Sequence, residues 1–82
     1  IDRLAIINDT VWVVEYKSNI LPPKSSQTVP KAYLRQLLLY HKLLAEIYMG
    51  KTIRCAILWT SVPEFMPIDN ALLDEGLLSS YI

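Results

Sequence analysis

The fold is decided by residues 11–17, VWVVEYK, and by the longer stretch 31–49, KAYLRQLLLYHKLLAEIYM, that follows in the chain. Residues 11–17 are rich in valine, which predicts a short strand. In residues 31–49 apolar side chains recur at steps of three and four, which predicts an amphipathic helix. Pro30 fits the first helical position, and Gly50 fits the left-handed residue that closes the helix.

A third apolar run, IRCAILW at residues 53–59, predicts a strand after the helix. A strand, a helix and a second strand of these lengths predict a βαβ unit with parallel strands. Toward the N-terminus, residues 1–7 and 11–17 flank the break NDT at residues 8–10, which predicts a β-hairpin. We therefore expect an α/β domain in which a mixed sheet is covered by one long helix.

The turn of this hairpin sets which side chains face one another. A two-residue turn at Asn8 and Asp9 places Asp2 directly opposite Glu15, whereas a turn shifted by one residue places Asp2 opposite Lys17. Both turns leave Asp2, Glu15 and Lys17 on one face of the sheet, because side chains alternate along a strand. A three-residue loop would turn Asp2 to the other face.

The last part of the chain predicts two short elements. Two prolines bracket an extended piece around Phe65, which can only be an edge strand because proline donates no hydrogen bond to a neighbouring strand. Asp69 or Asn70 fits the cap of a short helix that we expect to run through Leu78.

The length of 82 residues, or 9.4 kDa, allows a single small domain, residues 1–82. The chain begins at Ile1 without an initiator methionine, and its first strands are apolar on both faces, so that each needs a cover on both sides. One helix supplies one cover. We therefore expect a fragment of a larger protein whose upstream sequence supplies the other, and self-association of the fragment through the open face.

Composition excludes several classes of protein. The single cysteine, Cys55, excludes a disulfide framework and a cysteine-held iron–sulfur cluster, and no apolar run reaches the length of a membrane span. We expect a cytoplasmic protein with no membrane partner. The net charge of zero hides an asymmetry, because residues 1–54 carry all eight basic residues and only four of the eight acids. This favours an anionic partner for the first part of the chain, and an ordinary solvated surface is the alternative.

Asp2 and Glu15 suggest a metal site. Two opposed carboxylates destabilise a sheet unless a cation compensates them, and Lys17 supplies only one positive charge. Mg²⁺ binds one or two carboxylates and keeps several waters, so it could fill such a site, activate a water and stabilise a phosphodiester under attack. The alternative is a salt bridge between Glu15 and Lys17, with Asp2 merely solvated.

Gln36 and Tyr40 add a second element. Their spacing of four places them on one face of the predicted helix, which can lie over the C-terminal end of the Glu15 strand. Open α/β sheets bind their ligands outside such strand ends. The alternatives are a core packing role for Tyr40 and an ordinary polar position on the helix flank for Gln36.

Three motifs together resemble the PD-(D/E)xK nuclease superfamily in its RecB-like branch: IDR at 1–3, EYKS at 15–18 and QLLLY at 36–40. More narrowly, the chain resembles the nuclease domain at the C-terminal end of bacterial AddA-type helicase-nucleases, which act in double-strand break repair and recombination. The resemblance implies a partial restriction-endonuclease-like core and Mg²⁺-dependent exonuclease activity on DNA, with Mn²⁺ as a substitute metal. The tripeptide of the family more often begins with aspartate, where this chain has Glu15.

The resemblance also implies roles for single residues. Asp2, Glu15 and the backbone carbonyl of Tyr16 would bind the metal, and Lys17 would position the attacking water or stabilise the transition state. Gln36 and Tyr40 would support the site and contact DNA.

The parent protein implied by the resemblance is a bacterial, nucleoid-associated enzyme with a second helicase-nuclease subunit. ATP would be used only in its helicase portion, since no GxxxxGK[ST] motif occurs here. An upstream helix that carries a further site residue is missing, so we expect the isolated chain to be weakly active or inactive. Two alternatives remain: a catalytically silent copy of the fold that serves DNA binding or subunit scaffolding, and an unrelated α/β interaction module with Asp2 and Lys17 on different faces.

Overall fold

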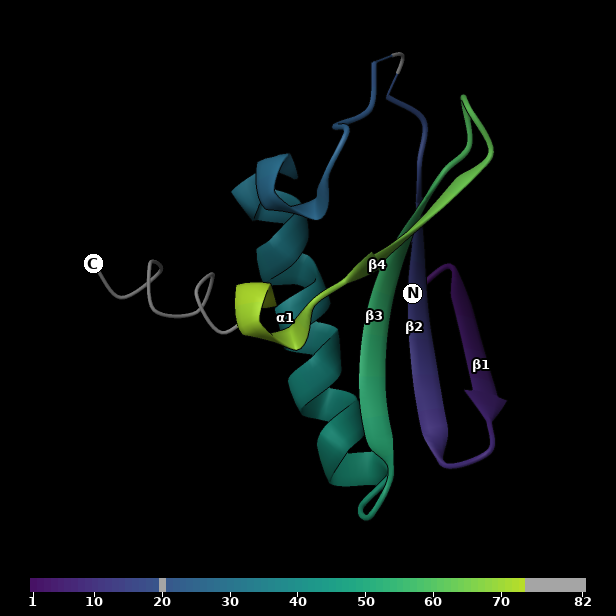
Figure 1. Ribbon diagram of the computed structural model, residues 1–82. Helices are drawn as coiled ribbons and strands as arrows, with labels where there is room; N and C mark the ends of the chain where they lie inside the picture. Colours follow the sequence, from purple (N-terminus) through teal and green to yellow (C-terminus); the bar gives the residue numbers. More distant parts are fainter. Residues whose placement is uncertain (20, 74–82) are drawn as a thin grey trace, which may run out of the picture.

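The computed structural model describes residues 1–19 and 21–73 and has one helix packed on a four-stranded sheet (Figure 1). The strands lie in the order β1-β2-β3-β4, and the helix α1, Lys31–Ile47, lies on one face of the sheet. This is the mixed α/β arrangement expected from the sequence. Within the described ranges, no helix is both long and apolar enough to cross a membrane.

The hairpin forms with the first of the two predicted turns. Strand β1, Arg3–Ile7, pairs antiparallel with β2, Thr10–Lys17, and Ile7 lies opposite Thr10 across the turn at Asn8 and Asp9. Asn8 has φ of 55°, in the left-handed region that asparagine tolerates better than most residues. The register Arg3 to Val14, extended by one residue, brings Asp2 opposite Glu15.

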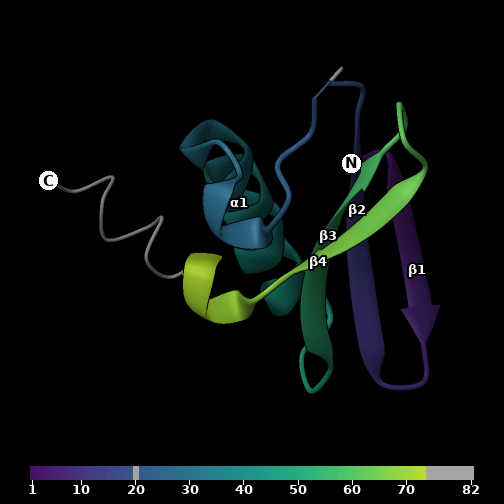
Figure 2. The same cartoon turned by 45° about the horizontal axis from the view of Figure 1, so that its top comes forward.

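The βαβ unit is also confirmed, because β2 pairs in parallel with β3, Thr52–Trp59, across the connection that contains α1. A 3₁₀ turn at Ser26–Thr28 precedes the helix. The core lies between α1 and the facing side of the sheet, and residues fully withdrawn from water include Val11, Val13, Leu37, Cys55, Ile57 and Trp59. Figure 2 shows the same two layers after rotation.

The ends of α1 differ slightly from the prediction. Pro30 is the N-cap and not the first helical residue, because its ψ of 135° is extended, and its carbonyl accepts hydrogen bonds from the amides of Tyr33 and Leu34. The helix ends at Ile47, two residues early, with Tyr48 as the C-cap. Gly50 does adopt the left-handed conformation, with φ of 86°, but it lies beyond the cap and helps the chain turn into β3.

The predicted edge strand is present as β4, Glu64–Ile68, antiparallel to β3. Pro67 lies within it, which an edge strand allows. A helical turn follows at residues 70–73, where the Asp69 carboxylate accepts a hydrogen bond from the amide of Ala71 at 2.9 Å. The rest of the predicted final helix, through Leu78, lies outside the described residues.

The sheet face opposite α1 has no covering element within the described part of the chain (Figure 2). Two aromatic rings partly cover it, since Trp12 and Phe65 lie with their centroids 5.8 Å apart, and Arg54 lies over the Trp12 ring at 5.2 Å. Ala56, on the same face, is fully buried. The expected open face therefore exists, with its centre shielded by an aromatic pair.

Candidate functional site

The Asp2 carboxylate is held at the end of the hairpin. Its Oδ2 accepts a hydrogen bond from the backbone N–H of Tyr16 at 2.8 Å. This backbone hydrogen bond lowers the pKa of Asp2 below its usual value, and the Glu15 side chain, the Ile1 amino group and Lys17 lower it further. The carboxylate is therefore ionised and kept beside β2, although the side chain is exposed to solvent.

Glu15 is the one buried charged residue of the described chain, at 5% exposure, and its side chain faces α1 from β2. Its Oε1 lies 3.4 Å from the amino nitrogen of Ile1 but accepts no hydrogen bond. Interaction with the Tyr40 hydroxyl and with Glu15 raises the pKa of this amino group above its ordinary value. A buried carboxylate is costly unless a positive charge lies beside it, and in this structure the Ile1 amino group is that charge.

Lys17 has a different environment from the one that a salt bridge would give it. Its Nζ donates to Gln36 Oε1 at 3.3 Å and lies 4.3 Å from the centre of the Tyr33 ring. Neither of the two ion pairs found in the described residues includes Lys17. The alternative of a Glu15–Lys17 salt bridge is therefore not formed, because the ammonium is drawn toward neutral groups on α1.

Gln36 and Tyr40 are neighbours on α1, as their spacing requires. Gln36 Nε2 donates to the Tyr40 hydroxyl at 3.4 Å, while its Oε1 accepts from Lys17. The amide thus links the lysine at the end of β2 to the tyrosine beside Ile1. The structure brings Asp2, Glu15, Lys17, Gln36 and Tyr40 to the C-terminal end of β2, where hydrogen bonds join Lys17, Gln36 and Tyr40 and a further one holds Asp2 on the Tyr16 amide.

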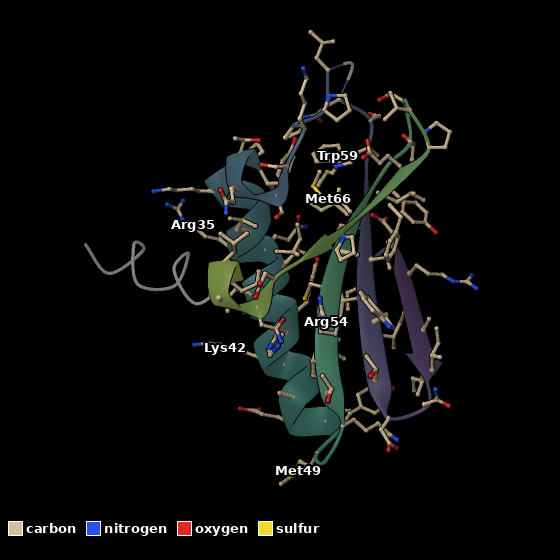
Figure 3. All side chains as sticks on the ribbon, viewed as in Figure 1. Arg35, Lys42, Met49, Arg54, Trp59 and Met66 are labelled. Carbon is tan, nitrogen blue, oxygen red and sulfur yellow. The ribbon has the colours of Figure 1, made fainter. Side chains whose placement is uncertain are left out.

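Sequence reasoning did not identify Tyr33 and Asn19 as part of this cluster. The Tyr33 hydroxyl donates to Asn19 Oδ1 at 3.2 Å, and its ring packs against Trp59, labelled in Figure 3, with centroids 6.2 Å apart. Tyr33 precedes Gln36 by three residues and so shares its helix face, a signal that could have found it. Asn19 lies in the loop after β2, and nothing in the sequence pattern indicates its contact.

The donor set for a metal is small. In residues 1–19 and 21–73 no three His, Cys, Asp or Glu side chains gather in a group that could hold an ion. Asp2 and Glu15 provide two carboxylates, which matches a cation that takes its remaining ligands from backbone carbonyls and water.

Comparison of the chain with protein-family models, with curated proteins and with solved structures gives no match.

Proposed function

We propose that the chain is part of the nuclease core of an AddA-type bacterial helicase-nuclease and takes part in metal-dependent hydrolysis of DNA during double-strand break repair and recombination. The observation that carries this proposal is that Asp2, Glu15, Lys17, Gln36 and Tyr40 lie together at the end of β2, with hydrogen bonds from Lys17 to Gln36 and from Gln36 to Tyr40. These are the positions at which the chain resembles the RecB-like nucleases. They come from three separate segments of the chain: the N-terminus, β2 and α1. The second helicase-nuclease subunit, the ATP-driven portion and a cytoplasmic, nucleoid-associated location belong to the same proposal.

The cluster suits a hard divalent cation. Asp2 is ionised, and the Glu15 carboxylate is buried with one positive group, the Ile1 amino group, 3.4 Å from its Oε1. Together with the Tyr16 carbonyl they would hold Mg²⁺, or Mn²⁺ in its place, through oxygen atoms alone. When bound, such an ion supplies a Lewis acid for the scissile phosphodiester.

The remaining chemistry belongs to side chains of the chain itself. Hydrolysis adds the oxygen of water to phosphorus and breaks one P–O ester bond, so negative charge develops on the phosphoryl oxygens. Lys17 carries a positive charge that no carboxylate of the described residues neutralises, and it can stabilise this developing charge. Gln36 accepts a hydrogen bond from the lysine and donates one to the Tyr40 hydroxyl, so Tyr40 supports the lysine through Gln36.

DNA degradation by the full-length protein that contains this chain tests the proposal. Lys17→Ala and Asp2→Ala are each expected to lower Mg²⁺-dependent hydrolysis about 100-fold, the typical loss when one stabilising group is removed. The matched controls are Lys42→Ala and Glu46→Gln, which remove a charge of the same sign from the exposed side of α1. Undiminished degradation by both site variants would refute the assigned mechanism.

Metal binding is measured separately from hydrolysis. Titration of the 82-residue chain with Mn²⁺, followed by electron paramagnetic resonance, should show a site that Asp2→Asn weakens and Glu46→Gln leaves unchanged. A wild-type full-length protein that binds DNA but neither binds the metal nor cleaves would instead support the catalytically silent module.

A further inference from the structure

Tyr33 makes three directional contacts around the end of β2. Lys17 Nζ lies over the face of its ring, 4.3 Å from the centroid. The hydroxyl donates to Asn19 Oδ1 at 3.2 Å, and the ring packs at a tilt against Trp59. A residue that only filled space in the core would not need all three.

The contact with the ring keeps the charge of Lys17 available. An aromatic face attracts an ammonium group within about 6 Å of its centroid, yet it carries no net charge of its own. A carboxylate in the same place would neutralise the lysine. Gln36 Oε1, the other acceptor, is also neutral. The lysine is therefore held by two neutral groups, and no carboxylate of the described residues forms an ion pair with it.

The position of the ring is fixed from outside the helix. Trp59, at the end of β3, is completely buried and packs against Tyr33. Asn19 is itself tied to the β3–β4 turn, because Ser61 Oγ donates to its carbonyl at 2.5 Å. The Tyr33 ring thus has its face toward Lys17 and its orientation set by two other segments of the chain.

We propose that Tyr33 is a positioning residue that holds the Lys17 ammonium beside Gln36 through its aromatic face, with its ring oriented by Asn19 and Trp59. The catalytic consequence rests on the proposed function, because an ordered and unneutralised lysine is useful where charge develops on a phosphate. The aromatic ring supplies the attraction, and the hydroxyl fixes the angle of the ring.

The positioning is tested by NMR on the 82-residue chain without any activity measurement. A ring below the ammonium shifts the proton resonance of the Lys17 ε-methylene group upfield from that of the exposed Lys42. Tyr33→Phe should keep most of this shift, and Tyr33→Leu, which keeps an apolar side chain at this position but removes the ring, should abolish it. The matched control is Tyr48→Leu, which removes a half-buried tyrosine at the other end of the helix. A Lys17 resonance that does not move in Tyr33→Leu would overturn the proposal.

The catalytic consequence is tested with the full-length protein. Tyr33→Leu is expected to lower kcat for DNA hydrolysis about 10-fold with KM unchanged, because the lysine acts on the transition state, and Tyr33→Phe should retain most of the activity. Equal kcat in Tyr33→Leu and wild type would overturn the catalytic consequence. Wild-type protein that binds DNA without hydrolysing it would refute the proposed function, while the Lys17 resonance still decides the positioning.

Discussion

Asp2 shows how an exposed side chain can have a defined position. Its carboxylate accepts a hydrogen bond from the Tyr16 backbone N–H, just beyond the last backbone pair of β1 and β2. A side chain therefore continues the hydrogen bonding of the hairpin. The same bond holds the pKa of Asp2 below its ordinary value. The residue therefore contributes to the hairpin and to the candidate site through one contact.

This contact predicts a pH-dependent loss of stability. Because the folded-state pKa of Asp2 is lowered, its stabilising effect is present above the ordinary value of 3.8 and is lost as the pH falls through the folded-state value. Asp2→Asn should therefore lower the melting temperature near neutral pH, and the difference from wild type should disappear in strong acid. Thermal unfolding by circular dichroism measures it, with Glu46→Gln as the control. A difference that is constant over the whole pH range would contradict this assignment.

Cys55 provides a second prediction at the level of one side chain. The thiol is fully buried between α1 and the sheet, and burial raises its pKa to about 12. The folded chain should thus react very slowly with a disulfide reagent at mildly alkaline pH, and reaction should become fast in urea. Rapid labelling in native buffer would contradict the buried position.

The raised pKa of Cys55 also affects stability at high pH. The ordinary pKa of a cysteine thiol is 9.0, so the free energy of unfolding should fall as the pH rises above this value, because there the thiol ionises only in the unfolded chain.

Among the elements, the hairpin depends most on a single residue. Asn8 adopts φ of 55°, where a β-branched side chain is strained by about 1–2 kcal/mol. Asn8→Val should lower the free energy of unfolding by about that amount, whereas Asn8→Gly should be nearly neutral. Urea unfolding gives both values. The control is Thr52→Val, which places a β-branched side chain at an exposed position at the start of β3 and should have little effect. Equal stability of the valine and glycine variants would show that the turn differs from the one described.

The helix α1 owes its position to packing more than to its own ends. Neither of its caps is a side-chain hydrogen bond, and its first turn carries no acid. Its buried leucines, among them Leu37, face the sheet, while Gln36 and Tyr40 occupy the flank above the end of β2. Periodicity in the sequence predicted which side of the helix is apolar. It could not predict the exact ends, because these depend on the ψ angle of Pro30 and on the turn into β3.

For the whole molecule, the open sheet face is the main feature without a partner in the described chain. Phe65 is half exposed on it, next to Trp12. Sedimentation at rising concentration should show self-association, and Phe65→Lys should weaken it by placing a charge on this face. Leu21→Lys, in the loop before α1, is the control and should not. A monodisperse monomer at all concentrations would contradict the prediction.

The one-dimensional pattern was sufficient for the strands, the helix, the parallel crossover and the shared face of Glu15 and Lys17, because side-chain alternation and helical periodicity are local properties. The folded chain alone decided the hairpin register, which brings Asp2 opposite Glu15, and also the ion pair of Glu15 with the Ile1 amino group and the contacts of Tyr33 and Asn19. Each of these depends on distances between segments that are far apart in sequence. Lys17 lies over an aromatic ring, and not beside a carboxylate, because core packing places the Tyr33 face of α1 next to the end of β2. The order of residues along one segment does not show which other segment will pack beside it.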